Sequence, residues 1–133
     1  MLLANTVSLV TGGGSGIGRA IALLFAREGS RVVIADRDGK RAESVASEID
    51  QAGGTAMAVE VDVASPEGVE YLFARADDVF GPVDILVNNA GASYGTDLRT
   101  IEPDVWDRNF NVVLKSAFLC TKAALPAMIA RNK

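Results

Sequence analysis

Short apolar runs alternate along the chain with segments whose apolar residues recur at helical spacing. Four continuous runs rich in β-branched residues predict strands: Thr6–Thr11, Arg31–Asp36, Ala56–Val63 and Val83–Asn88. The segments between them have apolar residues three or four positions apart and predict helices that end near Gly29, Gly53 and Gly81. A long helix is expected from about Asp104 to the last residue.

The order of these elements favours an α/β fold. Strands that are joined by helices pair in parallel through right-handed crossovers, which predicts a Rossmann-type doubly wound parallel sheet with strand order 3-2-1-4. No linker, repeat or low-complexity tract interrupts the pattern, so we expect residues 1–133 to form a single domain. Relative to a complete sheet of this kind, we expect the fold to be truncated after the fourth helix.

Composition narrows the classes of function. The formal net charge is −4 and the lysines and arginines form no block, which argues against nucleic-acid binding. Histidine is absent and Cys120 is the one cysteine, so neither a zinc site nor a disulfide within the chain is expected. A single thiol suits a reducing, cytoplasmic setting. We find no signal peptide and no apolar run near the ~20 residues of a membrane span, so no membrane contact is expected.

Each predicted strand is followed by polar or glycine-rich residues, at the edge where doubly wound sheets bind ligands. The first is followed by TGGGSGIG, Thr11–Gly18. Glycines allow the backbone to approach a ligand, and a helix N-terminus offers free N–H groups to an anion, so this turn suits a pyrophosphate. The G-x-G-x-x-G dinucleotide pattern is replaced by T-G-x-x-x-G-x-G, because Arg19 stands where its third glycine would fall. A plain glycine-rich turn is the alternative.

Asp36 closes the second strand, 18 residues after Gly18. A carboxylate at this place accepts hydrogen bonds from an adenosine ribose diol and repels a 2′-phosphate, so we favour NAD as the cofactor over NADP. Arg37 is a counterweight, because arginine can pair with a 2′-phosphate, whereas Ser15 adds no positive charge to the turn. The alternative interpretation of Asp36 is a helix cap or a solvated turn residue.

Together these segments resemble the short-chain dehydrogenase/reductase (SDR) family over essentially the whole chain. The resemblance depends on TGGGSGIG, on VVIAD at Val32–Asp36, on the pair Asp62–Val63 and on NNAG at Asn88–Gly91. It implies an NAD(P)-binding Rossmann fold and an oxidoreductase that transfers hydride between a nicotinamide and a small-molecule alcohol or carbonyl.

The resemblance also implies which residues bind the dinucleotide cofactor. They are Gly12, Ser15, Gly16, Ile17, Gly18, Asp36, Arg37, Asp62, Val63, Asn88, Ala90 and Gly91. In this interpretation the glycines form the pyrophosphate turn, Asp36 selects the ribose, and Asp62 and Val63 meet the adenine through side chain and backbone respectively. For Asn88, a side chain that only ties strand ends together is as plausible as direct cofactor contact.

The catalytic residues of the family are not recognised in the sequence. The family uses an asparagine, a serine, a tyrosine that acts as general acid/base, and a lysine four residues later that lowers the tyrosine's pKa. Tyr71 is followed at this spacing by Arg75 and Tyr94 by Leu98, so there is no Y-x-x-x-K. No catalytic residue is therefore assigned to this chain.

The segment NFNVVLKSAF, residues 109–118, bears on the tetrad asparagine. In the family this asparagine follows a tryptophan by seven positions, and counting from Trp106 leads to Val113. On an α-helix at ~100° per residue, Asn111 points about 200° away from that position. Asn109 is expected at the surface, Lys115 and Lys122 on a solvated face, and Cys120 in the core as a small apolar residue.

Three hypotheses of function stay open. The chain is the cofactor-binding half of an SDR oxidoreductase without the catalytic tetrad, or a non-catalytic dinucleotide-binding or regulatory module, or another Rossmann-like class such as a methyltransferase. TGGGSGIG and NNAG argue against the third. We also expect self-association, because the fourth strand would leave the apolar residues 85–87 at an open sheet edge. The sequence does not identify a substrate.

Overall fold

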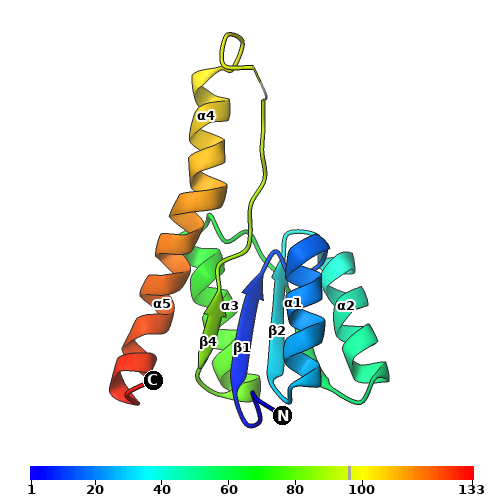
Figure 1. Ribbon diagram of the computed structural model, residues 1–133. Helices are drawn as coiled ribbons and strands as arrows, with labels where there is room; N and C mark the ends of the chain where they lie inside the picture. The colour runs from blue at the N-terminus through cyan, green and yellow to red at the C-terminus, as the bar shows by residue number, and fades with distance from the viewer. Residues whose placement is uncertain (96) are drawn as a thin grey trace.

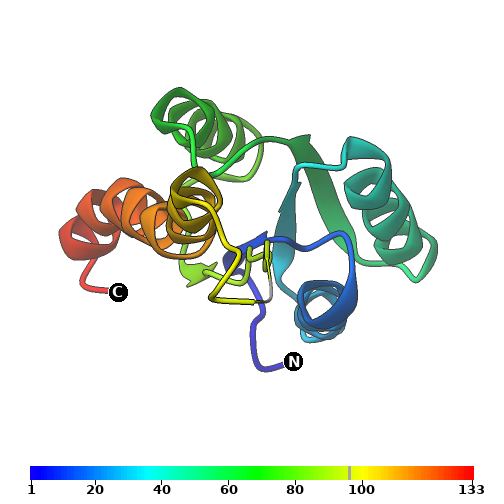
Figure 2. The same ribbon diagram turned by 90° about the horizontal axis from the view of Figure 1, so that it is seen from above.

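The computed structural model describes residues 1–95 and 97–133 and shows a parallel sheet with helices on both faces (Figures 1 and 2). Its strands are β1 (Val7–Thr11), β2 (Arg31–Asp36), β3 (Thr55–Glu60) and β4 (Ile85–Val87). Its helices are α1 (Gly16–Arg27), α2 (Gly39–Gln51), α3 (Pro66–Phe80), α4 (Pro103–Phe110), the π-helical segment η1 (Asn111–Lys115) and α5 (Ser116–Ala130). The strand order β3-β2-β1-β4, with every pair parallel, confirms the predicted doubly wound topology.

Two predicted strands are shorter than expected, and the long helix is not α-helical throughout. β3 ends at Glu60 instead of Val63, because the chain turns at Asp62, whose carboxylate accepts the N–H of Ala64 (3.0 Å). β4 has three residues instead of six, since the N–H of Asn89 turns back to the carbonyl of Val87 (3.0 Å). The long helix contains a π-helical segment, which an α-helical apolar period does not reveal.

Two apolar clusters cover the two faces of the sheet. Alternate residues of a buried parallel strand face opposite sides, so Val32 and Ile34 of β2 pack against α1 and α2, while Val33 and Ala35 pack against the cluster that includes α3 and α5. Cys120 of α5 lies fully buried in the cluster that includes α3 and α5, as expected. Burial raises the pKa of the Cys120 thiol to about 11, so the thiol stays protonated at neutral pH.

Helices α2 and α3 begin near the carboxyl edge of the sheet, and each start is fixed by a side-chain cap. Asp38 accepts the N–H groups of Lys40 and Arg41, and Ser65 accepts the N–H of Gly68 (3.1 Å) with a proline directly after it. Such caps satisfy N–H groups that have no partner within the helix. The caps therefore fix where the chain leaves β2 and β3.

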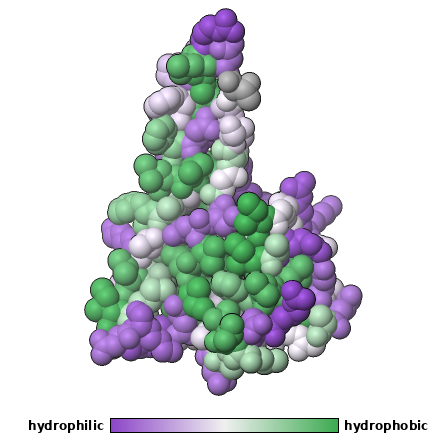
Figure 3. Space-filling view, viewed as in Figure 1, coloured by the Kyte–Doolittle hydropathy of each residue, from purple (hydrophilic) through white to green (hydrophobic). Residues whose placement is uncertain are grey.

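The helix that runs from α4 through η1 to α5 projects beyond the carboxyl edge of the sheet (Figure 1). The hydroxyl of Ser116 donates to the carbonyl of Val112 at 2.5 Å, within the π-helical segment. Large apolar side chains are exposed along this helix (Figure 3): Trp106, Phe110, Val113, Leu114, Phe118, Leu125 and Ile129. We call these seven residues the apolar face.

Within the described ranges, the helix 103–130 is long and apolar enough to cross a membrane, which the search for apolar runs in the sequence did not anticipate. Only length and composition support a membrane span here. Core helices of water-soluble proteins satisfy the same criterion, so the support is weak. α5 packs against α3, and Lys115 at the end of η1 and Lys122 on α5 are exposed.

Asp84 connects the amino end of the sheet to the end of the chain. Its carboxylate accepts the N–H of Val7 (2.9 Å), Nη1 of Arg131 (2.7 Å) and Nζ of Lys133 (3.0 Å), and its side chain is 8% exposed. Burial raises the pKa of Asp84, but the hydrogen bonds from Val7, Lys133 and Arg131 together outweigh it and leave the pKa below its ordinary value. The ionised carboxylate therefore stabilises the folded chain.

Asp84→Asn is expected to lower the free energy of unfolding by about 1–3 kcal/mol at neutral pH, because it removes the charge from a nearly buried, hydrogen-bonded position. The wild type keeps the contribution of Asp84 above the ordinary carboxyl pKa of 3.8 and loses it as the pH falls through the lowered pKa. Denaturant titrations should thus show the difference between the two proteins shrinking in acid. Asp78→Asn, at an exposed position of α3, is the control, and an equal loss in both variants would contradict the assignment.

Candidate functional site

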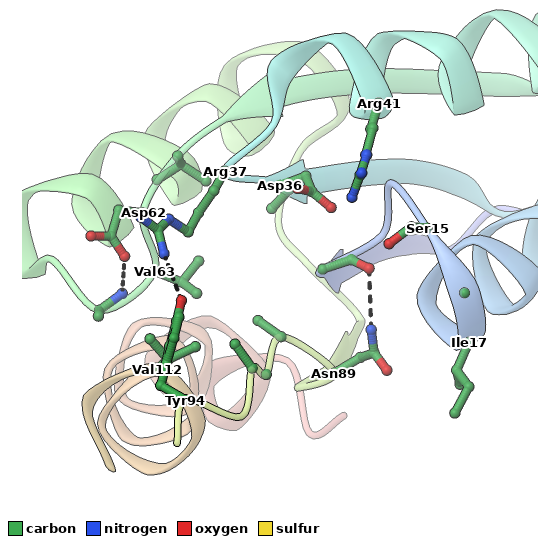
Figure 4. A pocket seen from close by; sticks show the side chains of 18 residues that line it. Ser15, Ile17, Asp36, Arg37, Arg41, Asp62, Val63, Asn89, Tyr94 and Val112 are labelled. Atoms are coloured by element: carbon green, nitrogen blue, oxygen red, sulfur yellow. Dashed lines mark hydrogen bonds between the residues drawn. The ribbon is translucent and has the colours of Figure 1, made fainter. Parts of the chain in front are cut away.

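A cleft of about 410 Å³ lies at the carboxyl ends of the strands (Figure 4). Ten of the twelve predicted cofactor residues line it: Gly12, Ser15, Gly16, Ile17, Asp36, Arg37, Asp62, Val63, Ala90 and Gly91. Gly18 and Asn88 do not. The topology therefore brings residues from all four strand ends to one place, as parallel pairing requires.

The glycine-rich turn forms the wall of the cleft at β1 and α1. Gly16 has φ +55°, and a Cβ built on it would meet nothing within 4 Å, so its backbone conformation is what calls for glycine. Helix α1 begins there, and the hydroxyl of Ser15 makes no cap hydrogen bond. The side chain of Ile17 is 74% exposed at the rim. Free N–H groups of a first helical turn beside a cleft suit an anionic group.

Gly18 lies beneath this turn, buried against the loop after β4. A Cβ on Gly18 would lie 2.2 Å from the carbonyl oxygen of Gly12 and 2.5 Å from Nδ2 of Asn89. Neither distance is possible for a real carbon. Gly18 is therefore required for close packing of α1 on the end of β1, and it does not face the cleft.

The hydroxyl of Thr11 joins the ends of β1 and β4. It accepts the N–H groups of Asn89 (3.0 Å) and Ala90 (2.9 Å) and donates to the carbonyl of Val87 (3.3 Å). Thr11 is 2% exposed, so these bonds form out of water. They fix the backbone of 89–91 against the glycine-rich turn.

The structure separates the roles of the two neighbouring asparagines. Nδ2 of Asn89 donates to the carbonyls of Thr11 (3.1 Å) and Gly12 (3.2 Å), and Asn89 lines the cleft. Nδ2 of Asn88 donates to the hydroxyl of Thr121 on α5 (3.1 Å), outside the cleft. Asn88 thus does not line the cleft, and its contact with α5 favours the alternative that it ties elements of the fold together, whereas Asn89, which the sequence interpretation missed, lines the cleft. The motif contains both, and only the strand's orientation shows which one faces β1.

Two backbone N–H groups orient the carboxylate of Asp36. Oδ2 accepts the N–H of Gly14 (2.9 Å) and Oδ1 accepts the N–H of Asp38 (2.9 Å). Each carboxylate oxygen can accept a further hydrogen bond, so the group stays competent to bind hydroxyls. The cap of α2 is Asp38, which sets aside the alternative that Asp36 is the helix cap.

The opposite wall comes from the turn after β3. Val63 is nearly buried at 6% exposure, whereas Asp62 is exposed and lines both this cleft and an adjoining cavity. Arg41, which the sequence interpretation missed, lines the cleft from the first turn of α2. Its place follows from Asp38, because an early residue of a capped helix lies near the strand end.

The helical wall of the cleft is contributed by Val112, which was also missed. Val113 is 51% exposed and does not line the cleft, and Asn111 lines the adjoining cavity. The expected angle of about 200° between Asn111 and Val113 assumes α-helical geometry. Residues 111–115 are π-helical, so this angle does not apply to them.

Asn109 is not a free surface residue, and that prediction is wrong. Its Oδ1 accepts the N–H of Tyr94 (2.9 Å), while its Nδ2 donates to the carbonyls of Tyr94 (2.8 Å) and Val105 (3.0 Å). Tyr94 in turn lines the cleft, and its hydroxyl accepts Nη1 of Arg37 (3.2 Å). No local pattern in the loop indicated this contact, which joins residues 57 positions apart.

Comparisons with a protein family and with individual proteins agree on the class of protein that this chain resembles. Residues 6–133 match the family described as short chain dehydrogenase. The chain is 37% identical over 129 residues to the BbsD subunit of (2S)-[(R)-hydroxy(phenyl)methyl]succinyl-CoA dehydrogenase of Thauera aromatica, covering 97% of this chain and 52% of that protein. It is 36% identical over 131 residues to an uncharacterized oxidoreductase of Staphylococcus aureus strain USA300, covering 98% and 56%. The chain thus spans about half the length of these relatives.

Gly18→Ala is expected to cost about 3 kcal/mol of unfolding free energy, because its methyl group would overlap the carbonyl of Gly12 and force the backbone apart. The control is Gly53→Ala, where φ is +86° but a Cβ meets nothing within 4 Å, so only conformational strain of about 1 kcal/mol is expected. Denaturant unfolding of both variants measures the difference. Equal losses would show that close packing at Gly18 is not limiting.

Proposed function

The chain belongs to the short-chain dehydrogenase/reductase family, and on that premise we propose that it is the dinucleotide-binding half of an oxidoreductase. The proposed reaction is hydride transfer between a nicotinamide and the alcohol or carbonyl group of a small molecule. The observation that carries the proposal is one cleft that combines the N-terminus of α1 with the oriented carboxylate of Asp36. An anion-binding helix end and a diol-binding carboxylate match the two ends of an adenosine diphosphate group.

The cofactor we propose is NAD rather than NADP. Asp36 supports this choice, because its carboxylate is fixed at the cleft by the N–H groups of Gly14 and Asp38 and would repel a 2′-phosphate. The adenine would then lie against the wall formed by Asp62 and Val63, and the pyrophosphate beside Gly16. The residues present therefore fit the group, and the nicotinamide would supply the hydride chemistry when bound.

We propose that residues 1–133 bind cofactor without completing the reaction alone. The sequence has no Y-x-x-x-K, the tyrosine–lysine pair on which proton transfer in the family depends. The buried thiol of Cys120 is protonated and is no nucleophile. It suits a reducing, cytoplasmic setting. The same lack of a tyrosine–lysine pair supports the alternative function, a dinucleotide-binding module with no catalysis.

Asp36→Asn is expected to weaken NAD binding by about tenfold, because an amide is a poorer acceptor for the ribose diol than a carboxylate. Isothermal titration of the full chain with NAD measures the change. Asp50→Asn, at an exposed position near the end of helix α2, should leave NAD affinity unaltered. If wild type fails to bind NAD, or if both variants bind it equally well, the proposed site is wrong. Steady-state turnover by the chain alone would refute the absence of catalysis.

We further propose that the chain self-associates. β4 lies at the edge of the sheet with residues 85–87 only half-buried, and the apolar face of the long helix is exposed. Exposed apolar surface and an unpaired strand edge both favour association with a second copy.

Sedimentation equilibrium at micromolar concentration is expected to give a mass above that of one chain, rising with concentration. Phe118→Glu should lower it, because the side chain is 60% exposed on the apolar face and a buried charge opposes association. Tyr71→Glu, at an aromatic residue of α3 that is 54% exposed, is the matched control. A strictly monomeric wild type would contradict self-association.

A further inference from the structure

Tyr94 is fixed to helix α4 through its backbone. Its N–H donates to Oδ1 of Asn109 (2.9 Å), and its carbonyl accepts Nδ2 of the same side chain (2.8 Å). That amide also donates to the carbonyl of Val105 (3.0 Å), which orients it along the helix. A two-way amide contact of this kind fixes both the position and the direction of the loop residue.

The ring of Tyr94 is fixed as well. The guanidinium carbon of Arg108 lies 5.2 Å from the ring centroid, within the range of a cation–π contact. With the backbone fixed by Asn109 and the ring covered by Arg108, the hydroxyl has a defined place in the wall of the cleft.

That hydroxyl accepts Nη1 of Arg37 at 3.2 Å, across the cleft from α4 to the end of β2 (Figure 4). Arg37 directly follows Asp36, yet its side chain points toward Tyr94 rather than toward the carboxylate (Figure 4). Among the described residues, Arg37 has no carboxylate within 4.0 Å. Two arginines line the cleft near Asp36: Arg41 pairs with the carboxylate of Asp38 (3.4 Å), whereas the guanidinium of Arg37 is held by the neutral hydroxyl of Tyr94.

We propose that Tyr94 is a specificity-determining residue that acts through Arg37. By holding the guanidinium of Arg37 beside its own hydroxyl, Tyr94 keeps that positive charge away from the place where the adenosine 2′-position would lie. Without the hydrogen bond to Tyr94, Arg37 could form a bidentate pair with a 2′-phosphate. The hydrogen bond to Tyr94 therefore opposes the binding of NADP. This inference rests on the proposed function, since it concerns the choice between two dinucleotides.

The test is the ratio of dissociation constants for NAD and NADP, measured by titration of the full chain. Tyr94→Phe keeps the ring and its contact with Arg108 but removes the acceptor of Arg37. We expect the ratio of the NADP to the NAD dissociation constant to fall about fivefold, as for the loss of one competing hydrogen bond. Tyr71→Phe on α3, far from the cleft, is the control and should leave the ratio as in wild type.

The double variant Tyr94→Phe/Arg37→Met separates the mechanism from a general effect of the tyrosine. Its ratio should equal that of Arg37→Met alone, because Tyr94 acts only through the guanidinium. A ratio unchanged by Tyr94→Phe, or a shift that persists without Arg37, overturns the inference while leaving NAD binding intact. A wild type that binds neither dinucleotide overturns the proposed function, and the inference with it. Denaturant unfolding of Tyr94→Phe establishes that the variant is folded.

Discussion

Everything at the binding edge depends on close packing at the carboxyl end of β1. There the carbonyl of Gly12 accepts Nδ2 of Asn89, and Gly18 brings α1 so near that no Cβ fits between them. The hydroxyl of Thr11 adds three further bonds to the backbone at the end of β4 and directly after it. Because glycine turn, helix start and fourth strand meet at one buried junction, the positions of the cleft's walls are set together. A change at the junction would thus reach residues that never touch a ligand.

The cleft built on this junction has an unequal distribution of charge. The carboxylate of Asp36 is fixed by two backbone N–H groups, the guanidinium of Arg37 is held by Tyr94, and Arg41 pairs with Asp38. A fixed acceptor at that point suits a ligand with hydroxyls there, and the N–H groups of α1 suit its phosphates. This arrangement is consistent with the proposed binding site, and the sequence adds no tyrosine–lysine pair that would make these residues a proton-transfer system.

The long helix connects binding to the surface of the molecule. Its first part fixes Tyr94 through Asn109, its π-helical segment contributes Val112 to the cleft, and its last part exposes apolar side chains. A π-helical segment inside an α-helix is uncommon and is often found at functional sites. Here one side of the helix contributes to the wall of the cleft, while the apolar face is exposed to solvent. A partner that covers the apolar face would therefore also restrain the part of the helix that holds Tyr94.

The sequence alone determined the fold and most of the cleft, because both follow from local patterns. Apolar periodicity gave four strands and their helices, and parallel strands place their carboxyl ends together, so Asp36, Asp62 and the glycine turn could be assigned to one edge. Only the tertiary structure decided between Asn88 and Asn89, made Asn109 a partner of Tyr94, and placed Val112 instead of Val113 at the cleft. The physical reason is that side-chain direction beyond a strand end, and inside a π-helical segment, is set by hydrogen bonds between residues distant in sequence, which no local period encodes.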